Sequence, residues 1–137
     1  MPLVLTPDTC PCGSGEPYAR CCEPLHHGFA AAPTAERLMR SRYSAFALGH
    51  TAYLLATWHP STRPATLDLD PGLVWTRLEI VGTTRGREHD AAGTVAFVAH
   101  FRDRASGRAG RQVENSSFRR EGGQWFYVDA VGAPRRA

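Results

Sequence analysis

The chain carries four cysteines, and all of them lie within the thirteen residues "CPCGSGEPYARCC": Cys10, Cys12, Cys21 and Cys22. Thiolates are soft ligands that bind zinc or iron in tetrahedral sites, and two short pairs can supply all four from one small peptide. Disulfides and a redox pair are the alternatives. Adjacent cysteines bridge only with strained geometry, and the C-x-x-C spacing of redox pairs is absent, so the pattern favours a metal site.

The residues around the cysteine pairs suit such a site. Residues 13–15 allow a sharp turn after the first pair, and residues 16–22 are predicted to form one helical turn that begins near Pro17. A segment this small has almost no core, so a bound metal would supply its folding free energy. Because four thiolates complete a tetrahedral set, we expect His26 and His27 to be loop or surrounding residues rather than ligands.

The composition is that of a globular chain of 137 residues, with 42% hydrophobic and 21% charged residues. No apolar run approaches the roughly 20 residues that span a bilayer. The first ten residues lack the features of a signal peptide, so we expect a cytoplasmic protein with reduced thiols. All sixteen basic residues are arginine, which excludes lysine chemistry, and a net charge of +3 is weak support for nucleic-acid binding.

The elements that must position the cysteines follow from periodicity. We expect a linker at residues 23–33 and then a helix that is capped by Thr34 and stopped by Gly49. Its apolar positions have helical spacing: Ala35, Leu38, Met39, Tyr43 and Phe46. A second helix is predicted from Thr51 to a point before Pro60. Four strands with glycine-rich turns follow, at 74–82, 94–103, 111–120 and 124–131. Short turns predict antiparallel neighbours and an α+β domain with helices on one face of the sheet.

The cysteine-rich stretch resembles the SEC-C motif, the zinc-binding tail module of the SecA translocation ATPase. In SecA the last ligand is often histidine, whereas here it is Cys22. Together with "APTAERLMRSRYSAFALGHTAYLLATWHPSTRP", the chain resembles the YchJ family, which joins a SEC-C motif to a nuclear-transport-factor-2-like domain. The resemblance implies a knuckle and linker at 1–29 and, at 30–137, a curved antiparallel sheet of about four strands packed on N-terminal helices.

The same resemblance implies a zinc-binding adaptor and does not supply a reaction. Its partner could be the SecB chaperone or the ribosome, contacted by four residues of the knuckle: Ser14, Glu16, Tyr18 and Arg20. Zinc is the expected metal, with iron as the alternative. We expect the metal to hold only the knuckle, so that chelation unfolds residues up to about 25 and spares the main domain.

A cone-shaped domain usually contains a pocket, so the rival hypothesis is a small-molecule binder or enzyme. Its candidate residues are Arg42, Tyr43, His59, His100, Glu114 and Ser116. Residue frequencies favour a solvent-facing position over a pocket wall for Glu114 and Ser116. Glu114 and His100 would form an acid–base pair only if their strands align. We interpret His59 as a helix-capping residue rather than a catalytic one.

Two arginines flank Ser41 in the first predicted helix. We interpret Arg40 as a solvated residue, whereas Arg42 lies close to the apolar stripe and is expected to have a partner. Trp58 is expected in the core.

Overall fold

The computed structural model describes residues 9–131. Within this range the elements begin with a 3₁₀ turn, η1 (Tyr18–Arg20), and a short helix, α1 (Glu23–His26). No helix in residues 9–131 is long and apolar enough to cross a membrane. The first ten residues, which are not expected to form a signal peptide, lie almost wholly outside the described residues. The outer ends of the two predicted domains also lie outside them.

Two further helices follow, α2 (Ala35–Leu48) and α3 (Thr51–Ala56). Thr34 caps α2, because its Oγ1 accepts a hydrogen bond of 3.1 Å from the backbone N–H of Arg37. Gly49 ends the helix with a φ of +81°, which glycine adopts at little cost. Both predicted helix boundaries of α2 are therefore confirmed.

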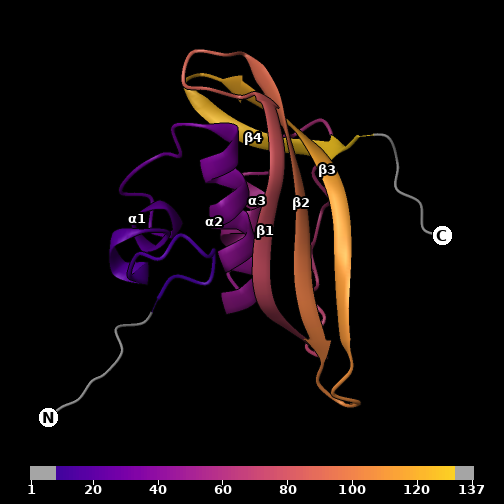
Figure 1. Cartoon of the computed structure of the whole chain (residues 1–137). Coiled ribbons are helices and arrows are strands. Elements are labelled where there is room, and N and C mark those ends of the chain that lie inside the picture. Colours follow the sequence, from indigo (N-terminus) through magenta and orange to yellow (C-terminus); the bar gives the residue numbers. More distant parts are fainter. Residues whose placement is uncertain (1–8, 132–137) are drawn as a thin grey trace, which may run out of the picture.

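The rest of the chain is one antiparallel sheet in which each strand pairs with its neighbours along the chain. Its strands are β1 (Leu73–Arg85), β2 (Ala92–Asp103), β3 (Ala109–Glu121) and β4 (Gln124–Ala130). Register shifts interrupt β1 between Trp75 and Arg77 and again between Ile80 and Gly82. Such bulges bend a sheet, and Figure 1 shows the long strands curving around α2. The predicted α+β fold is confirmed.

The main core lies between α2 and the concave face of the sheet. Alternate residues of β2, Val95, Phe97 and Ala99, are buried against apolar residues of α2 such as Leu38 and Met39. The backbone N–H of Ala35 donates to the carbonyl of Gly86 at 2.9 Å, which fixes the start of α2 to the end of β1.

The expected linker at 23–33 is partly wrong, since α1 occupies its first four residues. Leu25 in α1 is 6% exposed and belongs to the same core cluster as the residues of α2 and the sheet. The N-terminal unit therefore packs directly on α2. Figure 1 shows the resulting order, with the N-terminal unit on one side of α2 and the sheet on the other.

Candidate metal centre

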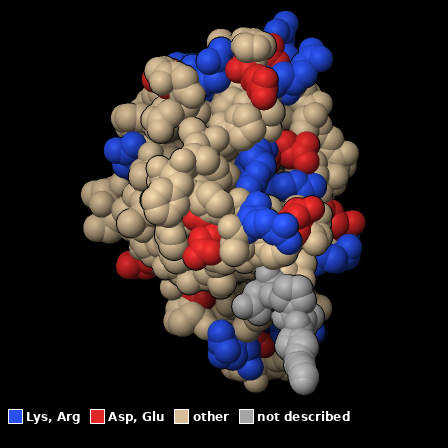
Figure 2. Space-filling view, turned by 90° about the vertical axis from the view of Figure 1, so that its left-hand side faces the viewer, with Lys and Arg blue, Asp and Glu red and all other residues tan. Residues whose placement is uncertain are grey.

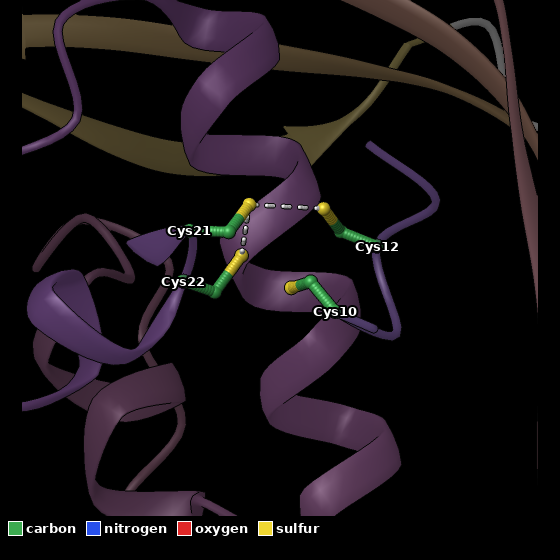
Figure 3. Close-up of side chains that lie close together, drawn as sticks. All are labelled: Cys10, Cys12, Cys21 and Cys22. Atoms are coloured by element: carbon green, nitrogen blue, oxygen red, sulfur yellow. Dashed lines mark hydrogen bonds between the residues drawn. The ribbon is translucent and has the colours of Figure 1, made fainter. Parts of the chain in front are cut away.

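The four cysteine sulfur atoms converge at one point between the N-terminal loop and α2. Figure 3 shows Cys10 and Cys12 approaching from one side and Cys21 and Cys22 from the other. All four Sγ atoms lie within 4.8 Å of one another, and all four residues are buried. They are free thiols, with Cys12 and Cys21 sulfurs 3.6 Å apart.

Local structure brings the two pairs together as the sequence predicts. Gly13 follows the first pair with a φ of +84°, so the chain reverses there, and the backbone N–H of Cys10 donates to the carbonyl of Glu16 at 2.8 Å. The η1 turn then returns the chain, and the N–H of Cys21 donates to the carbonyl of Tyr18 at 3.0 Å. The site is thus built by thirteen consecutive residues.

The thiols influence each other's ionisation. Hydrogen bonding to Cys10 lowers the pKa of Cys12, whereas hydrogen bonding to Cys12 raises the pKa of Cys10. Hydrogen bonding to Cys10 lowers the pKa of Cys22, but contact with Cys12 and burial outweigh this and raise it to about 11. Four such thiols cannot all be anionic side by side unless a cation compensates their charge, and a divalent metal would do so.

Two arginines of α2 fasten the cysteine unit to the domain. Arg37 donates from Nη1 to Cys22 Sγ at 3.4 Å and from Nη2 to the carbonyl of Cys21. Arg40 donates to the carbonyl of Cys12 at 2.8 Å and to Glu36 at 3.1 Å. Burial lowers the pKa of Arg37, but its bond to Cys22 raises the pKa overall, so this guanidinium stays charged beside the sulfurs.

The solvated interpretation of Arg40 is therefore wrong, and the role of Arg37 was missed. The signal that could have revealed them is their spacing of three residues, which places both side chains on one side of the helix.

A cluster of aromatic and imidazole rings completes the junction. His26 bonds Tyr18 Oη at 2.6 Å through Nδ1 and donates from Nε2 to the carbonyl of Ser41 at 2.8 Å. Its ring centroid lies 4.8 Å from that of His50 and 4.7 Å from that of Tyr53. His26 therefore has a packing role between α1 and α2, and it lies outside the group of four sulfurs.

The four residues predicted to contact a partner differ in their exposure to solvent. Ser14, Glu16 and Arg20 are exposed, although Ser14 Oγ also lies 3.1 Å from Cys21 Sγ. Tyr18 is half-buried and packs within its own unit. Burial raises the pKa of Tyr18 to about 12, so its hydroxyl is neutral at physiological pH and can donate to His26.

The six pocket candidates do not all meet. Arg42, Tyr43, Glu114 and Ser116 line one cavity between α2 and the sheet. The solvent-facing interpretation of Glu114 and Ser116 is wrong, because Ser116 is only 1% exposed and both residues form part of the cavity wall.

The two histidines among these candidates lie elsewhere. His100 faces the outer side of the sheet, where its Nε2 lies 2.7 Å from Glu79 Oε1. Glu114 pairs across the strands with Phe97, not with His100, so the acid–base pair does not form. His59 follows α3 and bonds Glu121 at 3.0 Å and Ser61 at 2.7 Å.

Comparison with known proteins divides the chain into the same cysteine-rich unit and larger domain. The family model for the middle NTF2-like domain of YchJ matches residues 34–130, and the SEC-C motif model matches residues 7–24. The chain belongs to the YchJ family.

Relatives in this family include a UPF0225 protein of Streptomyces coelicolor, 56% identical over 120 residues that cover 88% of this chain and 92% of the relative. A UPF0225 protein of Chromobacterium violaceum is 53% identical over 127 residues, covering 90% and 93%.

Two solved structures share the architecture. The solution structure of a SEC-C motif containing protein from Rhodopseudomonas palustris has a TM-score of 0.80 and 32% identity, covering 92% of this chain and 99% of that one. The crystal structure of a SEC-C motif containing protein from Psychrobacter arcticus has a TM-score of 0.73 and 27% identity, covering 94% and 85%. Both structures therefore share the fold of this chain over most of its length, and the printed description of each names a SEC-C motif.

Proposed function

We propose that the chain is a non-enzymatic zinc-binding adaptor of the cytoplasm, in which the cysteine unit presents a fixed surface to a partner protein. The observation that carries this proposal is the convergence of four buried thiols within 4.8 Å. Cys10, Cys12, Cys21 and Cys22 would hold the ion. A set of four sulfur donors suits zinc first and iron second.

The role assigned to this metal is structural. Metal sites that activate water keep one coordination position open, whereas four thiolates fill all the positions of a tetrahedral ion. Buried sulfurs and the two arginines of α2 enclose the site further. The metal would fix the fold of residues 10–22 and hold them against α2.

The surface that this unit offers supports the adaptor role. The loop between the two cysteine pairs is largely exposed, and besides two glycines its exposed residues are Ser14, Glu16, Ala19 and Arg20. Figure 2 looks onto this side of the molecule, where a broad and mostly uncharged area includes an acidic patch, and further charged side chains gather to its right and at its top. A loop that is already ordered loses little entropy on binding. The resemblance to the SecA tail suggests SecB or the ribosome as the partner.

The first test concerns the metal. Elemental analysis of freshly purified protein should find close to one zinc, or one iron, per chain, as four thiolates predict. The quadruple variant with serine at all four positions should contain none. Metal-free wild-type protein with a Cys21–Cys22 disulfide, prepared under reducing conditions, would overturn the metal assignment.

The second test concerns the partner and uses purified SecB and purified ribosomes. The Cys10→Ser/Cys12→Ser variant should lose binding because the loop is no longer held. The Glu16→Ala/Arg20→Ala variant should keep its metal and also lose binding. His100→Ala, on the outer face of the sheet, is the matched control. If the loop variants bind as the wild type does and His100→Ala does not, the adaptor surface lies elsewhere.

A further inference from the structure

A cavity of about 280 Å³ lies between α2 and the concave face of the sheet, away from the cysteine unit. Six aromatic rings line it: Tyr43, Phe46, Trp58, Trp75, Phe97 and Tyr127. Small-molecule sites are typically apolar hollows of roughly this size with a few fixed polar groups. Trp75 packs edge-on against Tyr43, with centroids 6.1 Å apart, so the walls are formed by rings that support one another.

The first polar group in the wall is a buried cation. Arg42 is 3% exposed, and its Nη1 donates to the carbonyl of Leu54 and to Thr57 Oγ1, both at 2.7 Å. Its guanidinium carbon lies 5.1 Å from the centroid of Trp58 and 4.7 Å from that of Tyr127.

Within residues 9–131 no carboxylate lies in ion-pair range of Arg42. Burial lowers the pKa of Arg42 to about 10, so it remains charged at neutral pH. The charge of Glu114 raises the pKa of Arg42 without pairing with it directly, so an anionic ligand group could still supply a direct ion-pair partner for this buried cation.

The second polar group is a carboxylate held in place by neutral donors. Glu114 accepts hydrogen bonds from Ser116 Oγ at 2.7 Å and from Gln112 Nε2 at 2.9 Å. The hydroxyl of Tyr127 also donates to it, at 3.4 Å. Tyr127 therefore contacts both charged groups, with its ring against Arg42 and its hydroxyl against Glu114. The cavity thus carries a cation and an anion that are kept apart.

We infer that this cavity binds a compact aromatic zwitterion, with the chemistry of an aromatic α-amino acid. A carboxylate on the ligand would pair with Arg42, and an ammonium group would pair with Glu114. The apolar body would lie among the aromatic rings, which also attract a cation through their faces.

A ligand with one charge fits less well. It would pair with one of the two charged protein groups and leave the other without an oppositely charged partner, which lowers affinity. A ligand can enter from solvent, because Gln112 is exposed and four of the ring-bearing wall residues are only half-buried: Phe46, Trp58, Trp75 and Tyr127.

The three tryptophans allow a test with an internal control. Trp58 and Trp75 line the cavity, whereas Trp125 does not and donates from Nε1 to the carbonyl of Pro33 at 3.1 Å. In ¹H–¹⁵N spectra of the full-length wild-type protein, L-phenylalanine or L-tyrosine should shift the indole signals of Trp58 and Trp75 and leave that of Trp125 in place. Phenethylamine and 3-phenylpropionate each lack one of the two charges, and the affinity of each should be lower than that of L-phenylalanine by a factor of about ten or more.

Variants separate the two charged groups without relying on one substitution. Glu114→Gln should weaken the binding of L-phenylalanine about tenfold or more and change the binding of 3-phenylpropionate little, because 3-phenylpropionate has no ammonium group. Arg42→Met should also weaken the binding of L-phenylalanine about tenfold or more, but it should change the binding of phenethylamine little, because phenethylamine has no carboxylate. Glu79→Gln, on the outer face, is the control. The inference fails if neither amino acid shifts Trp58 and Trp75 at millimolar concentration. It also fails if both single-charge analogues bind as tightly, or if Trp125 shifts equally.

Discussion

Replacing Arg37 by methionine tests whether the domain stabilises the metal site. Arg37 makes two charge-assisted contacts with the cysteine unit, one to Cys22 Sγ at 3.4 Å and one to the carbonyl of Cys21. Methionine keeps much of the apolar stem and removes both donors. When the thiolates hold zinc, the centre carries excess negative charge, and the guanidinium offsets part of it.

Hydrogen bonds to charged groups are worth about 1.5–3 kcal/mol each, and the half-buried position of Arg37 places the total loss near that of one such bond. Zinc affinity should therefore fall about 10- to 100-fold, a range typical of residues that surround metal ligands. A competition titration with a chromophoric zinc chelator at pH 7.5 measures this ratio directly.

Arg20→Met is the matched control, since Arg20 is an exposed arginine of the same unit. It should change zinc affinity less than about threefold, in keeping with the small effect of exposed charges. If Arg37→Met also binds zinc within threefold of the wild type, the cysteine unit holds its metal without help from α2. The contacts to Cys21 and Cys22 would then contribute to docking alone.

Three further predictions follow from the same contacts. Chelation should raise amide hydrogen exchange up to about residue 24 and leave the main thermal transition in place, because Leu25 belongs to the main core; exchange measured by mass spectrometry that rises equally in the strands would contradict this. Gly93→Ala should lower the free energy of unfolding by about 1–3 kcal/mol in urea melts, since a Cβ there would lie 2.4 Å from Gly86, whereas Gly82→Ala, with open space, should change it little. Burial lowers the pKa of His26 below its ordinary value of 6.5, so as the pH falls His26 is protonated in the unfolded chain before it is protonated in the folded protein. The stability contributed by neutral His26 is complete above pH 6.5 and is lost as the pH falls through the lower pKa of the folded protein. The difference in urea midpoint between the wild type and His26→Asn should therefore narrow from pH 7.5 to 5.5. A constant difference would show that His26 does not titrate in this way.

Local chemistry made much of the fold predictable. Thr34 and Gly49 act on residues within one turn of themselves, so the bounds of α2 follow from the sequence. The four cysteines converge through a turn of a few residues, which spacing alone also indicates. Strand positions follow from runs of apolar residues between glycine-rich turns.

Contacts between distant elements could not be predicted in the same way. Alternation along β3 groups Glu114 with Ser116, but it does not say whether that face looks inward or outward. Residue frequency favoured solvent, whereas the cavity makes this polar face an inner wall. The partner of His100 depends on the pairing of β1 with β2, and two bulges in β1 shift that register. Arg40 was misjudged because its acceptor is a backbone carbonyl 28 residues earlier in the chain.

The position of α2 between two units also sets the order in which its faces find partners during synthesis. Arg37 and Arg40 contact residues that precede them, so a metal-bound cysteine unit can form and dock as soon as α2 leaves the ribosomal tunnel. The opposite, apolar face must wait for strands made later, and the contact between Pro33 and Trp125 spans 92 residues. At translation rates of roughly 5–20 residues per second, Trp125 is made about 5–20 seconds after Pro33, so this contact forms at least that long after Pro33 is made. Under the metal assignment proposed above, supply of the ion therefore matters while the polypeptide is still incomplete, before any stability of the finished protein can be measured.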